Sequence, residues 1–217
     1  MANSPAPFLW LCGPPAVGKS TVGYEVFTQV NRSGVKAAYV DLSQIGFCRP
    51  ARDGDPTADR DPAADGDPDT HGDGDTHGGG PDAHRLRALN LGAMWPVFRA
   101  AGARCLVVTG RVADHDTVAR YAEAVPGTVL TLCRLRAGRD RLTQRILARG
   151  RGGGPPIMGD ELRGLPADEL HRIAERAVRC SGALDRTGLG DVCVDTDRGS
   201  VEELARLVRE RTGWPRF

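Results

Sequence analysis

The segment that most constrains this chain is an apolar run leading into a glycine-rich turn, within residues 8–22. Gly13, Gly18, Lys19 and Ser20 stand at the spacing G-x-x-x-x-G-K-S. The apolar residues before the turn are typical of a buried strand, and those after it repeat at helical spacing. A glycine-rich turn between a strand and a helix N-terminus lets backbone N–H groups converge on a phosphate. The segment therefore predicts a phosphate-binding loop, against the alternative of a plain glycine turn.

Each part of this loop suits one part of a nucleoside triphosphate and its metal ion. Lys19 would reach the β- and γ-phosphates, and the hydroxyl of Ser20 would bind Mg²⁺. Pro14 and Pro15 lack an N–H, but they fall in the first half of the loop, where they stiffen the turn. Lys19 is one of only two lysines among 29 basic residues, so a lysine here is informative. We expect the cofactor-binding residues of the loop to be Gly13, Ala16, Val17, Gly18, Lys19, Ser20 and Thr21.

The length and charge of the chain bound its organisation. The 217 residues fit one domain, with or without a lid, that spans the whole chain. The formal net charge of +1 conceals two parts. Between residues 50 and 84, ten aspartates face two arginines, a net charge of −8 that leaves about +9 on the rest of the chain. A basic body of this kind suits anionic ligands.

Residues 50–83 carry no helical or strand periodicity and consist mainly of Asp, Gly, Pro, Ala and Thr. Asp-Thr-His-Gly occurs twice, at 69–72 and 75–78. Such a composition cannot bury enough apolar area to offset its ordering entropy, so we expect a disordered insertion within the domain. The alternative is a cation site with His71, His77 and the aspartates, although their spacing lacks the calcium-loop pattern that ends in a Glu.

The six cysteines indicate a reducing compartment. None of them stands in a C-x-x-C pair, and four fall in predicted strands, where they act as small buried apolar residues. The apolar run near the N-terminus is short and soon interrupted, which does not fit a signal peptide or a membrane span. We therefore expect a cytoplasmic protein with no membrane partner.

Hydrophobic periodicity predicts alternating strands and helices after the loop. Further strands are expected at 35–40, 105–109, 128–133 and 191–196. Helices are expected at 19–30, from residue 85, after an Asp114 N-cap, at 139–149, at 168–180, and after a capping box of Ser200 and Glu203. In the helix from residue 85, the expected apolar face consists of Leu86, Leu89, Ala93, Val97 and Phe98, and Pro96 is expected to kink or divide the helix.

Asp41 follows the second strand directly. The carboxyl ends of parallel strands meet at one edge of a sheet, so Asp41 is expected at the same rim as the phosphate loop. There it would serve as a base or a substrate clamp. The alternative is an Asp that only caps a turn at residues 42–43. Further candidates for substrate binding are Gln44, Arg49, Asn90 and Arg111, although Asn90 also suits plain solvation.

Three arginines mark the helix at 139–149. Arg141, Arg145 and Arg149 recur every four residues, apart from the apolar face. Like charges at this spacing destabilise an isolated helix by about 0.2–0.5 kcal/mol per pair, and a bound polyphosphate would remove that cost. A Gly- and Pro-rich hinge follows at 151–156. We interpret 139–165 as a lid whose arginines close over phosphates, with a solvated arginine face as the alternative.

The order of these elements resembles the small P-loop kinases of the nucleoside-monophosphate-kinase type. Adenylylsulfate, gluconate and shikimate kinases and chloramphenicol phosphotransferase look nearest. The resemblance implies a three-layer α/β fold of the P-loop NTPase type, with a five-stranded parallel sheet flanked by helices and a small lid. It also implies ATP and Mg²⁺ at residues 13–21, Asp41 against the acceptor hydroxyl, Arg145 and Arg149 in the lid, and Thr196 to Arg198 beside the adenine. The third strand departs from that pattern, because it ends in Val-Val-Thr-Gly-Arg without an acid. Either Asp41 or Asp114 would then complete the Mg²⁺ shell beside Ser20, through water.

These observations predict an ATP-dependent phosphotransferase that acts on a hydroxyl of a small molecule such as a metabolite, a nucleoside or an antibiotic. Catalysis would depend on positioning and charge neutralisation by Lys19, Mg²⁺ and the lid arginines. The alternative is a nucleotide-dependent ATPase or switch that acts with a macromolecular partner. Nucleic-acid ends are a further possible acceptor, but no aromatic stacking platform is visible, so we do not expect a nucleic-acid partner. The acceptor's identity and the oligomeric state stay open.

Overall fold

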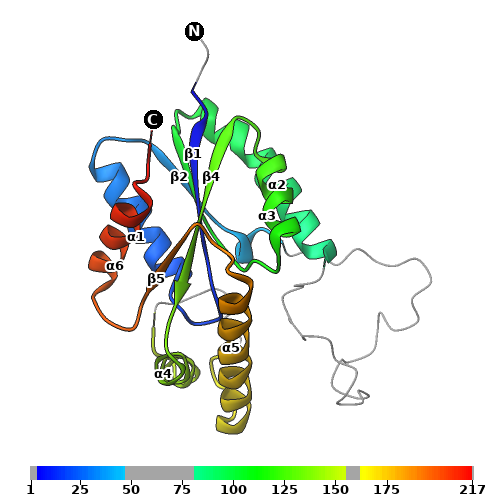
Figure 1. Ribbon diagram of the computed structural model, residues 1–217, viewed down its shortest axis with the longest axis vertical. Helices are drawn as coiled ribbons and strands as arrows, with labels where there is room; N and C mark the ends of the chain where they lie inside the picture. Colours follow the sequence, from blue (N-terminus) through cyan, green and yellow to red (C-terminus); the bar gives the residue numbers. More distant parts are fainter. Residues whose placement is uncertain (1–3, 47–80, 155–161, 217) are drawn as a thin grey trace, which may run out of the picture.

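The computed structural model describes residues 4–46, 81–154 and 162–216. Arg49, and the predicted insertion up to residue 80 with its histidines, lie outside the described residues. Strands and helices alternate through the described chain (Figure 1). The elements are β1 (Ala6–Cys12), α1 (Lys19–Arg32), β2 (Ala37–Asp41), the short 3₁₀ turn η1 (Leu42–Gln44), α2 (Pro81–Ala100), β3 (Cys105–Thr109), α3 (His115–Ala124), β4 (Thr128–Arg136), α4 (Arg139–Gly150), α5 (Ala167–Thr187), β5 (Val192–Asp195) and α6 (Val201–Thr212).

The strands form one parallel sheet in the order β2-β3-β1-β4-β5. β1 lies at its centre, and all seven of its residues are buried. A parallel sheet covered on both faces needs strands that are apolar throughout, which is what the run before the loop supplies. The predicted five-stranded parallel α/β fold is confirmed.

Helices cover both faces of the sheet (Figure 1). α1 and α6 lie on one side, over a core that includes Leu9, Val26 and Val208. α2 and α3 lie on the other side, over a core that includes Trp10 and Tyr121, whose ring centroids are 4.7 Å apart. α4 and α5 pack on each other near the carboxyl ends of the strands. Because the helices cover the two faces of the sheet, a ligand can reach the strands only at an edge, such as the one where their carboxyl ends lie.

The face of α2 that packs on the sheet differs from the predicted one. Leu89 and Val97 are 62% and 66% exposed, whereas Ala88, Leu91 and Trp95 are buried. The reason is the contact between α2 and α3: a Cβ on Gly92 would lie 2.5 Å from the carbonyl oxygen of Ala124. This close approach turns the face of α2 around Gly92 towards α3. The hydrophobic pattern of α2 alone does not predict this contact with another helix.

Helix ends follow the local chemistry of the sequence. The Asp114 carboxylate accepts a hydrogen bond from the Thr117 N–H at 2.7 Å, and the Ser200–Glu203 capping box is formed in both directions. Both predicted caps are therefore confirmed. α5 extends well beyond its predicted end at residue 180: it continues through Gly182 and ends at Gly188, which adopts the left-handed conformation at φ 61°.

The cysteines lie where the sequence places them. Cys12, Cys105 and Cys133 are buried in β1, β3 and β4, Cys193 lies in β5, and Cys180 lies in α5. These five are free thiols. Burial raises the pKa of Cys12, Cys105 and Cys133 to about 12, so their thiols stay protonated and unreactive near neutral pH.

Candidate active site at the carboxyl edge of the sheet

The glycine-rich loop leaves β1 in a backbone conformation that few residues can adopt. Gly13 and Gly18 have φ of 143° and 103°, and Ala16 has φ of 59°. A Cβ on Gly13 would lie 2.4 Å from the Leu135 carbonyl oxygen, so only glycine fits there. A non-glycine residue in the left-handed region costs about 1–3 kcal/mol and persists mainly at functional sites. The turn delivers the chain to the N-terminus of α1, where helix N–H groups favour an anion.

Lys19 is folded over this loop. Its Nζ donates to the carbonyl oxygens of Gly13 at 3.1 Å and Pro14 at 2.9 Å. Burial of the ammonium group, and secondarily the charge of Arg111, lower the pKa of Lys19 to about 8. The charge of Asp41 acts in the opposite direction and raises this pKa. Lys19 is therefore a cation whose surroundings favour the arrival of negative charge.

Asp41 is the last residue of β2 and caps the turn that follows. Its Oδ1 accepts hydrogen bonds from the Ser43 N–H at 3.0 Å and the Ser43 hydroxyl at 2.7 Å. The alternative interpretation of this residue, a cap of the turn, is therefore present in the structure. The cap uses one carboxylate oxygen and fixes the orientation of the other. A role towards substrate or metal stays a prediction.

The end of β3 carries the Thr109 hydroxyl, paired with that of Tyr39 on β2, where a P-loop protein commonly has an acid. Thr109 pairs in register with Asp41, so the carboxylate stands one strand further out. The Tyr39 and Thr109 hydroxyls are 3.1 Å apart, and Tyr39 Oη also donates to the Ser20 carbonyl oxygen at 3.3 Å. Burial raises the pKa of Tyr39 to about 12, so its hydroxyl keeps its proton. α1 approaches β3 closely because Gly23 has no side chain: a Cβ there would meet Thr109 Cγ2 at 2.2 Å.

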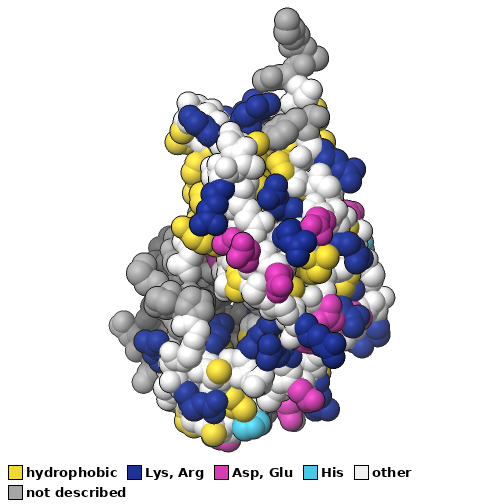
Figure 2. Space-filling view, turned by 90° about the vertical axis from the view of Figure 1, so that its left-hand side faces the viewer, with side chains coloured by type: hydrophobic (Ala, Val, Ile, Leu, Met, Phe, Trp, Pro, Cys, Tyr) yellow, Lys and Arg dark blue, Asp and Glu magenta, His cyan; other side chains and the backbone are white. Residues whose placement is uncertain are grey.

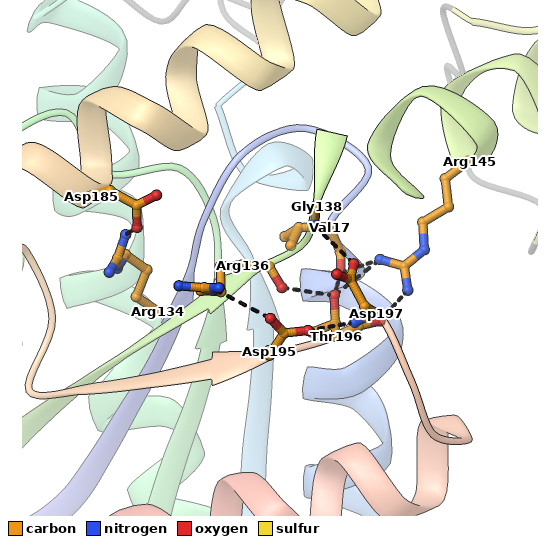
Figure 3. Close-up of polar contacts among 9 residues, drawn as sticks. All are labelled: Val17, Arg134, Arg136, Gly138, Arg145, Asp185, Asp195, Thr196 and Asp197. Atoms are coloured by element: carbon orange, nitrogen blue, oxygen red, sulfur yellow. Dashed lines mark hydrogen bonds and ion pairs between the residues drawn. The ribbon is translucent and has the colours of Figure 1, made fainter. Parts of the chain in front are cut away.

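On the other side of the loop, Arg145 joins three segments (Figure 3). Its Nη1 donates to the Val17 carbonyl oxygen and to Thr196 Oγ1, both at 3.0 Å, and its Nη2 donates to the Thr196 carbonyl oxygen at 2.6 Å. Desolvation, and then the charge of Arg141, lower the pKa of Arg145 from the ordinary value of an arginine. This guanidinium is held against the loop and the β5–α6 connection.

A pocket of about 670 Å³ opens beside these segments. Its lining residues come from the start of α4 and from the segment after β5: Gly138, Arg139, Asp140, Arg141, Gln144 and Asp197. Asp197 Oδ1 accepts from the Gly138 N–H at 2.8 Å, and Arg141 Nη1 donates to Gln144 Oε1 at 3.0 Å. The volume is typical of sites for small molecules and cofactors. The pocket lies in sequence beside the predicted adenine-flanking residues, of which Thr196 is buried and Arg198 exposed.

The remaining predicted substrate residues are spread along the rim. Asn90 Nδ2 donates to the Ile45 carbonyl oxygen at 2.7 Å, which ties α2 to the segment after β2. Gln44 is exposed, and its Nε2 donates to the Ser43 hydroxyl at 3.3 Å. Arg111 is exposed just after β3, and its charge acts on Lys19. Asn90 thus shapes the rim, and direct substrate contacts of these residues stay predictions.

Sequence reasoning missed several residues of this edge. Tyr39 has a recognisable signal, because it stands two residues before Asp41 and alternate strand residues share a face. Asp140 and Gln144 have none, since only the placement of α4 beside the segment after β5 brings them to one pocket with Asp197, which lies within the predicted adenine-flanking range.

Two negative findings hold for the described ranges. Within them, no three or more His, Cys, Asp or Glu side chains gather as a metal site. In the same part of the chain, no helix is both long enough and apolar enough to cross a membrane. The sequence predicts only two protein ligands for the metal ion, Ser20 and Asp41, with Asp114 as the alternative to Asp41. That number suits Mg²⁺, which usually keeps several waters and binds substrate phosphates beside one or two protein groups.

The fold and the loop together place this chain among the α/β proteins with a P-loop NTPase fold. A scan against protein-family models and a search of curated proteins found no match.

Solved small-molecule kinases share the fold. The APS kinase of Mycobacterium tuberculosis, solved with AMPPNP and APS, is 14% identical with a TM-score of 0.51, over 96% of this chain and 98% of that chain. A gluconokinase from Sinorhizobium meliloti is 16% identical with a TM-score of 0.52, over 97% and 91%. A sugar kinase from a Janibacter species is 13% identical with a TM-score of 0.52, over 97% and 96%. The resemblance to P-loop small-molecule kinases is thereby confirmed at the level of the fold.

Proposed function

We propose that this protein is an ATP-dependent phosphotransferase that moves the γ-phosphate of Mg–ATP to a hydroxyl group of a small molecule. The observation that carries the proposal is the loop at Gly13–Ser20, with a half-buried lysine at its head and the Asp41 carboxylate at the same edge of the sheet. Backbone donors and a cation suit the triphosphate, and a carboxylate suits the hydroxyl that receives the phosphate. The fold shared with small-molecule kinases supports this reading.

The loop and the start of α1 would bind the triphosphate. The N–H groups around Gly18 and at the head of α1 suit the β-phosphate. The Lys19 ammonium would exchange its bonds to the Gly13 and Pro14 carbonyl oxygens for bonds to β- and γ-phosphate oxygens. Thr21, in the first turn of α1, would add a donor to the α-phosphate. Arg141 and Arg149 of α4 would neutralise further negative charge, as proposed lid residues.

Asp41 would orient the acceptor. One carboxylate oxygen is fixed by Ser43, so the other can accept a hydrogen bond from the acceptor hydroxyl. As the acceptor oxygen bonds to the γ-phosphorus, the bond from that phosphorus to the β–γ bridging oxygen breaks, and ADP leaves. The hydroxyl proton passes to the carboxylate. Gln44, Asn90, Arg111 and Arg49 are the proposed neighbours of the acceptor.

The Ser20 hydroxyl and the Asp41 carboxylate, the latter through water, would hold Mg²⁺. Both belong to the segments that Tyr39 joins, since its hydroxyl contacts the Ser20 carbonyl oxygen and its pKa responds to Asp41. The ion would supply charge neutralisation on the phosphates. The carboxylate on β2 would thus replace the acid that β3 lacks.

The pocket at the start of α4 would take the nucleobase. Thr196 to Arg198 would flank the adenine, and Arg141 is among the residues that line the pocket. A cytoplasmic location stays a prediction from the cysteines.

The function is tested by incubating the full chain with Mg–ATP and pools of nucleosides, sugars or antibiotics, and measuring ADP release with and without each pool. We expect release that depends on one pool, and its loss in Lys19→Met. Release that is independent of every pool, but responds to a protein partner, would instead support an ATPase or switch. Release that is equal in Lys19→Met would contradict both.

A further inference from the structure

The carbonyl oxygen of Val17 lies within hydrogen-bond distance of two donor groups on the side of the loop that faces β5, the Arg145 guanidinium and the Thr196 hydroxyl, whose single proton it shares with the Arg136 carbonyl oxygen. Arg145 Nη1 and Thr196 Oγ1 each lie 3.0 Å from it (Figure 3). Val17 is fully buried and Thr196 is 1% exposed, so water does not replace these bonds. A buried carbonyl needs a hydrogen-bond partner, and a bond from a guanidinium is stronger than one from a neutral group. The two residues come from α4 and from the segment after β5, far away in the sequence.

The orientation of this carbonyl fixes the orientation of one amide in the loop. The Val17 C=O and the Gly18 N–H belong to one peptide group, which is planar and trans, so they point in opposite directions. Holding the oxygen towards β5 therefore aims the Gly18 N–H away from β5, into the turn. The flanking left-handed residues, Ala16 and Gly18, give the alternation of conformations that builds an anion-binding concavity from successive N–H groups.

Thr196 is itself anchored on the sheet. Its N–H donates to the Arg136 carbonyl oxygen at 2.8 Å, and its Oγ1 lies 3.1 Å from the same oxygen. Its own carbonyl oxygen accepts from Arg145 Nη2 at 2.6 Å. The chain of contacts thus runs from the end of β4 through Thr196 and Arg145 to Val17. These hydrogen bonds connect the phosphate loop to the sheet and restrict its conformation.

We propose that Arg145 and Thr196 are positioning residues that orient the Gly18 amide for phosphate binding. This inference rests on the proposed function and deepens it, because it gives Arg145 a role in forming the phosphate site rather than in closing over it. If one donor is removed, a buried oxygen has one partner fewer, and the Val17–Gly18 peptide gains freedom to rotate. The first consequence is a loss of affinity for phosphate groups.

The test uses Mg²⁺ and inorganic tripolyphosphate, which has no nucleobase, in calorimetric titrations of the full chain. We expect Thr196→Val to weaken tripolyphosphate about 5- to 20-fold, as for one lost bond to a buried group. Thr196→Ser, which keeps the hydroxyl, should stay within about twofold of wild type. Arg145→Ala should weaken binding more than Arg145→Lys. The double variant should lose less than the product of the single losses, because both donors act on one oxygen.

A matched control is available at Thr212. It is 6% exposed, and its Oγ1 donates to the Val208 carbonyl oxygen at 2.7 Å near the end of α6. Thr212→Val removes the same kind of bond far from the loop and should leave tripolyphosphate affinity unchanged. Arg206→Ala serves likewise for the loss of a positive charge, since Arg206 is exposed and pairs with Glu210.

A second measurement reads the amide itself. Val–Gly occurs only twice in the sequence, at 17–18 and 22–23. Labelling valine carbonyls with ¹³C and glycine nitrogens with ¹⁵N therefore selects two amide signals in a carbonyl-correlated NMR spectrum, those of Gly18 and Gly23. In ligand-free Thr196→Val and Arg145→Ala we expect the Gly18 signal to move or broaden, while that of Gly23, inside α1, stays in place.

The outcomes distinguish a failure of the positioning role from a failure of the proposed phosphotransferase function. If wild type binds neither tripolyphosphate nor ATP, the proposed function fails. If wild type binds both, but Thr196→Val binds tripolyphosphate like wild type and leaves the Gly18 signal unmoved, the positioning role is wrong. In that case a loss confined to Arg145→Ala would make Arg145 a direct phosphate ligand.

Discussion

At the scale of single residues, the charge of Lys19 affects both phosphate binding and the stability of the fold. Its ammonium is satisfied by two carbonyl oxygens of its own loop, yet burial still lowers its pKa to about 8 from the ordinary 10.5. Because the folded-state pKa lies below the unfolded one, the charged lysine costs stability below about pH 8. The stability that this residue contributes rises as the pH goes from about 8 to about 10.5. The ligand-free loop is therefore prepared for an anion at some expense to the fold.

Triphosphate binding should restore the proton of Lys19. Above about pH 8, part of the ligand-free protein carries a neutral lysine, and bound phosphate favours the charged form. We expect proton uptake on binding of Mg–ATP near that pH, and an affinity that falls as the pH rises further. Calorimetry in two buffers of different ionisation enthalpy measures the uptake. Equal apparent enthalpies in both buffers would show that Lys19 does not titrate on binding.

Asp41 should separate binding from transfer. Asp41→Asn keeps an acceptor for the Ser43 bonds but removes the negative charge and the basicity of the carboxylate. We expect ATP affinity to stay near that of wild type and phosphate transfer to fall about 10²- to 10⁴-fold. Transfer close to wild-type rates would show that Asp41 is not the base. A loss of the Mg²⁺ dependence of ATP binding would assign it to the metal instead.

Among the elements, α2 shows that close backbone approach can decide which helix face is buried. Gly92→Ala would place a Cβ 2.5 Å from the Ala124 carbonyl oxygen. We expect this change to lower the free energy of unfolding by about 1–3 kcal/mol, because backbone has to move to admit the methyl group. ATP affinity should change little, since Gly92 lies away from the loop. Denaturant unfolding measures the first effect and calorimetry the second.

Gly182→Ala in α5 is the matched control. A Cβ there meets only Arg186 Nη1, at 3.6 Å, so the substitution should be neutral or stabilise the protein by up to about 1 kcal/mol. If both glycine substitutions had the same effect, helix propensity rather than the α2–α3 contact would explain the result.

The elements were predictable to the extent that local pattern determines them. β1 and β3 are apolar almost throughout, and Asp114 and Ser200 cap helices through bonds to residues three positions away. The loop was recognisable because its chemistry lies within eight consecutive residues. By contrast, the Arg145–Val17 bond joins residues 128 positions apart, and periodicity along α4 predicted Arg145 as a lid arginine over phosphates, with no sign of its bond to the loop backbone. The buried face of α2 was missed for the same reason, since it depends on a contact with α3.

At the scale of the whole molecule, the surface seen in Figure 2 carries more basic than acidic side chains. Lys and Arg side chains are prominent over the face of α1 and α6 and below it, with fewer Asp and Glu (Figure 2). Several elements contribute residues to the site. The loop follows β1, Tyr39 and Asp41 come from β2, Thr109 comes from β3, and Arg145 comes from α4. Binding of a polyphosphate should therefore stabilise the fold as a unit.

This stabilisation should depend on the phosphate chain. A ligand that binds only the folded state adds about 2.7 kcal/mol at a hundred times its Kd. We expect Mg–ATP, Mg–ADP and Mg–tripolyphosphate to raise the melting temperature, and AMP, which lacks the phosphates nearest Lys19, to raise it far less. Scanning calorimetry at matched ligand concentrations gives the order. Equal shifts with AMP and ATP would place recognition in the nucleobase pocket rather than in the loop.

Titration of Mg–ATP into the full chain, beside Lys19→Met, examines the binding on which the whole proposal stands. Wild type should give a saturable heat with one site per chain, and the variant should bind at least about tenfold more weakly, since it loses the cation at the head of α1. An absence of heat with wild type, or equal affinities for the two proteins, would contradict nucleotide binding at this loop and with it the proposed phosphotransfer.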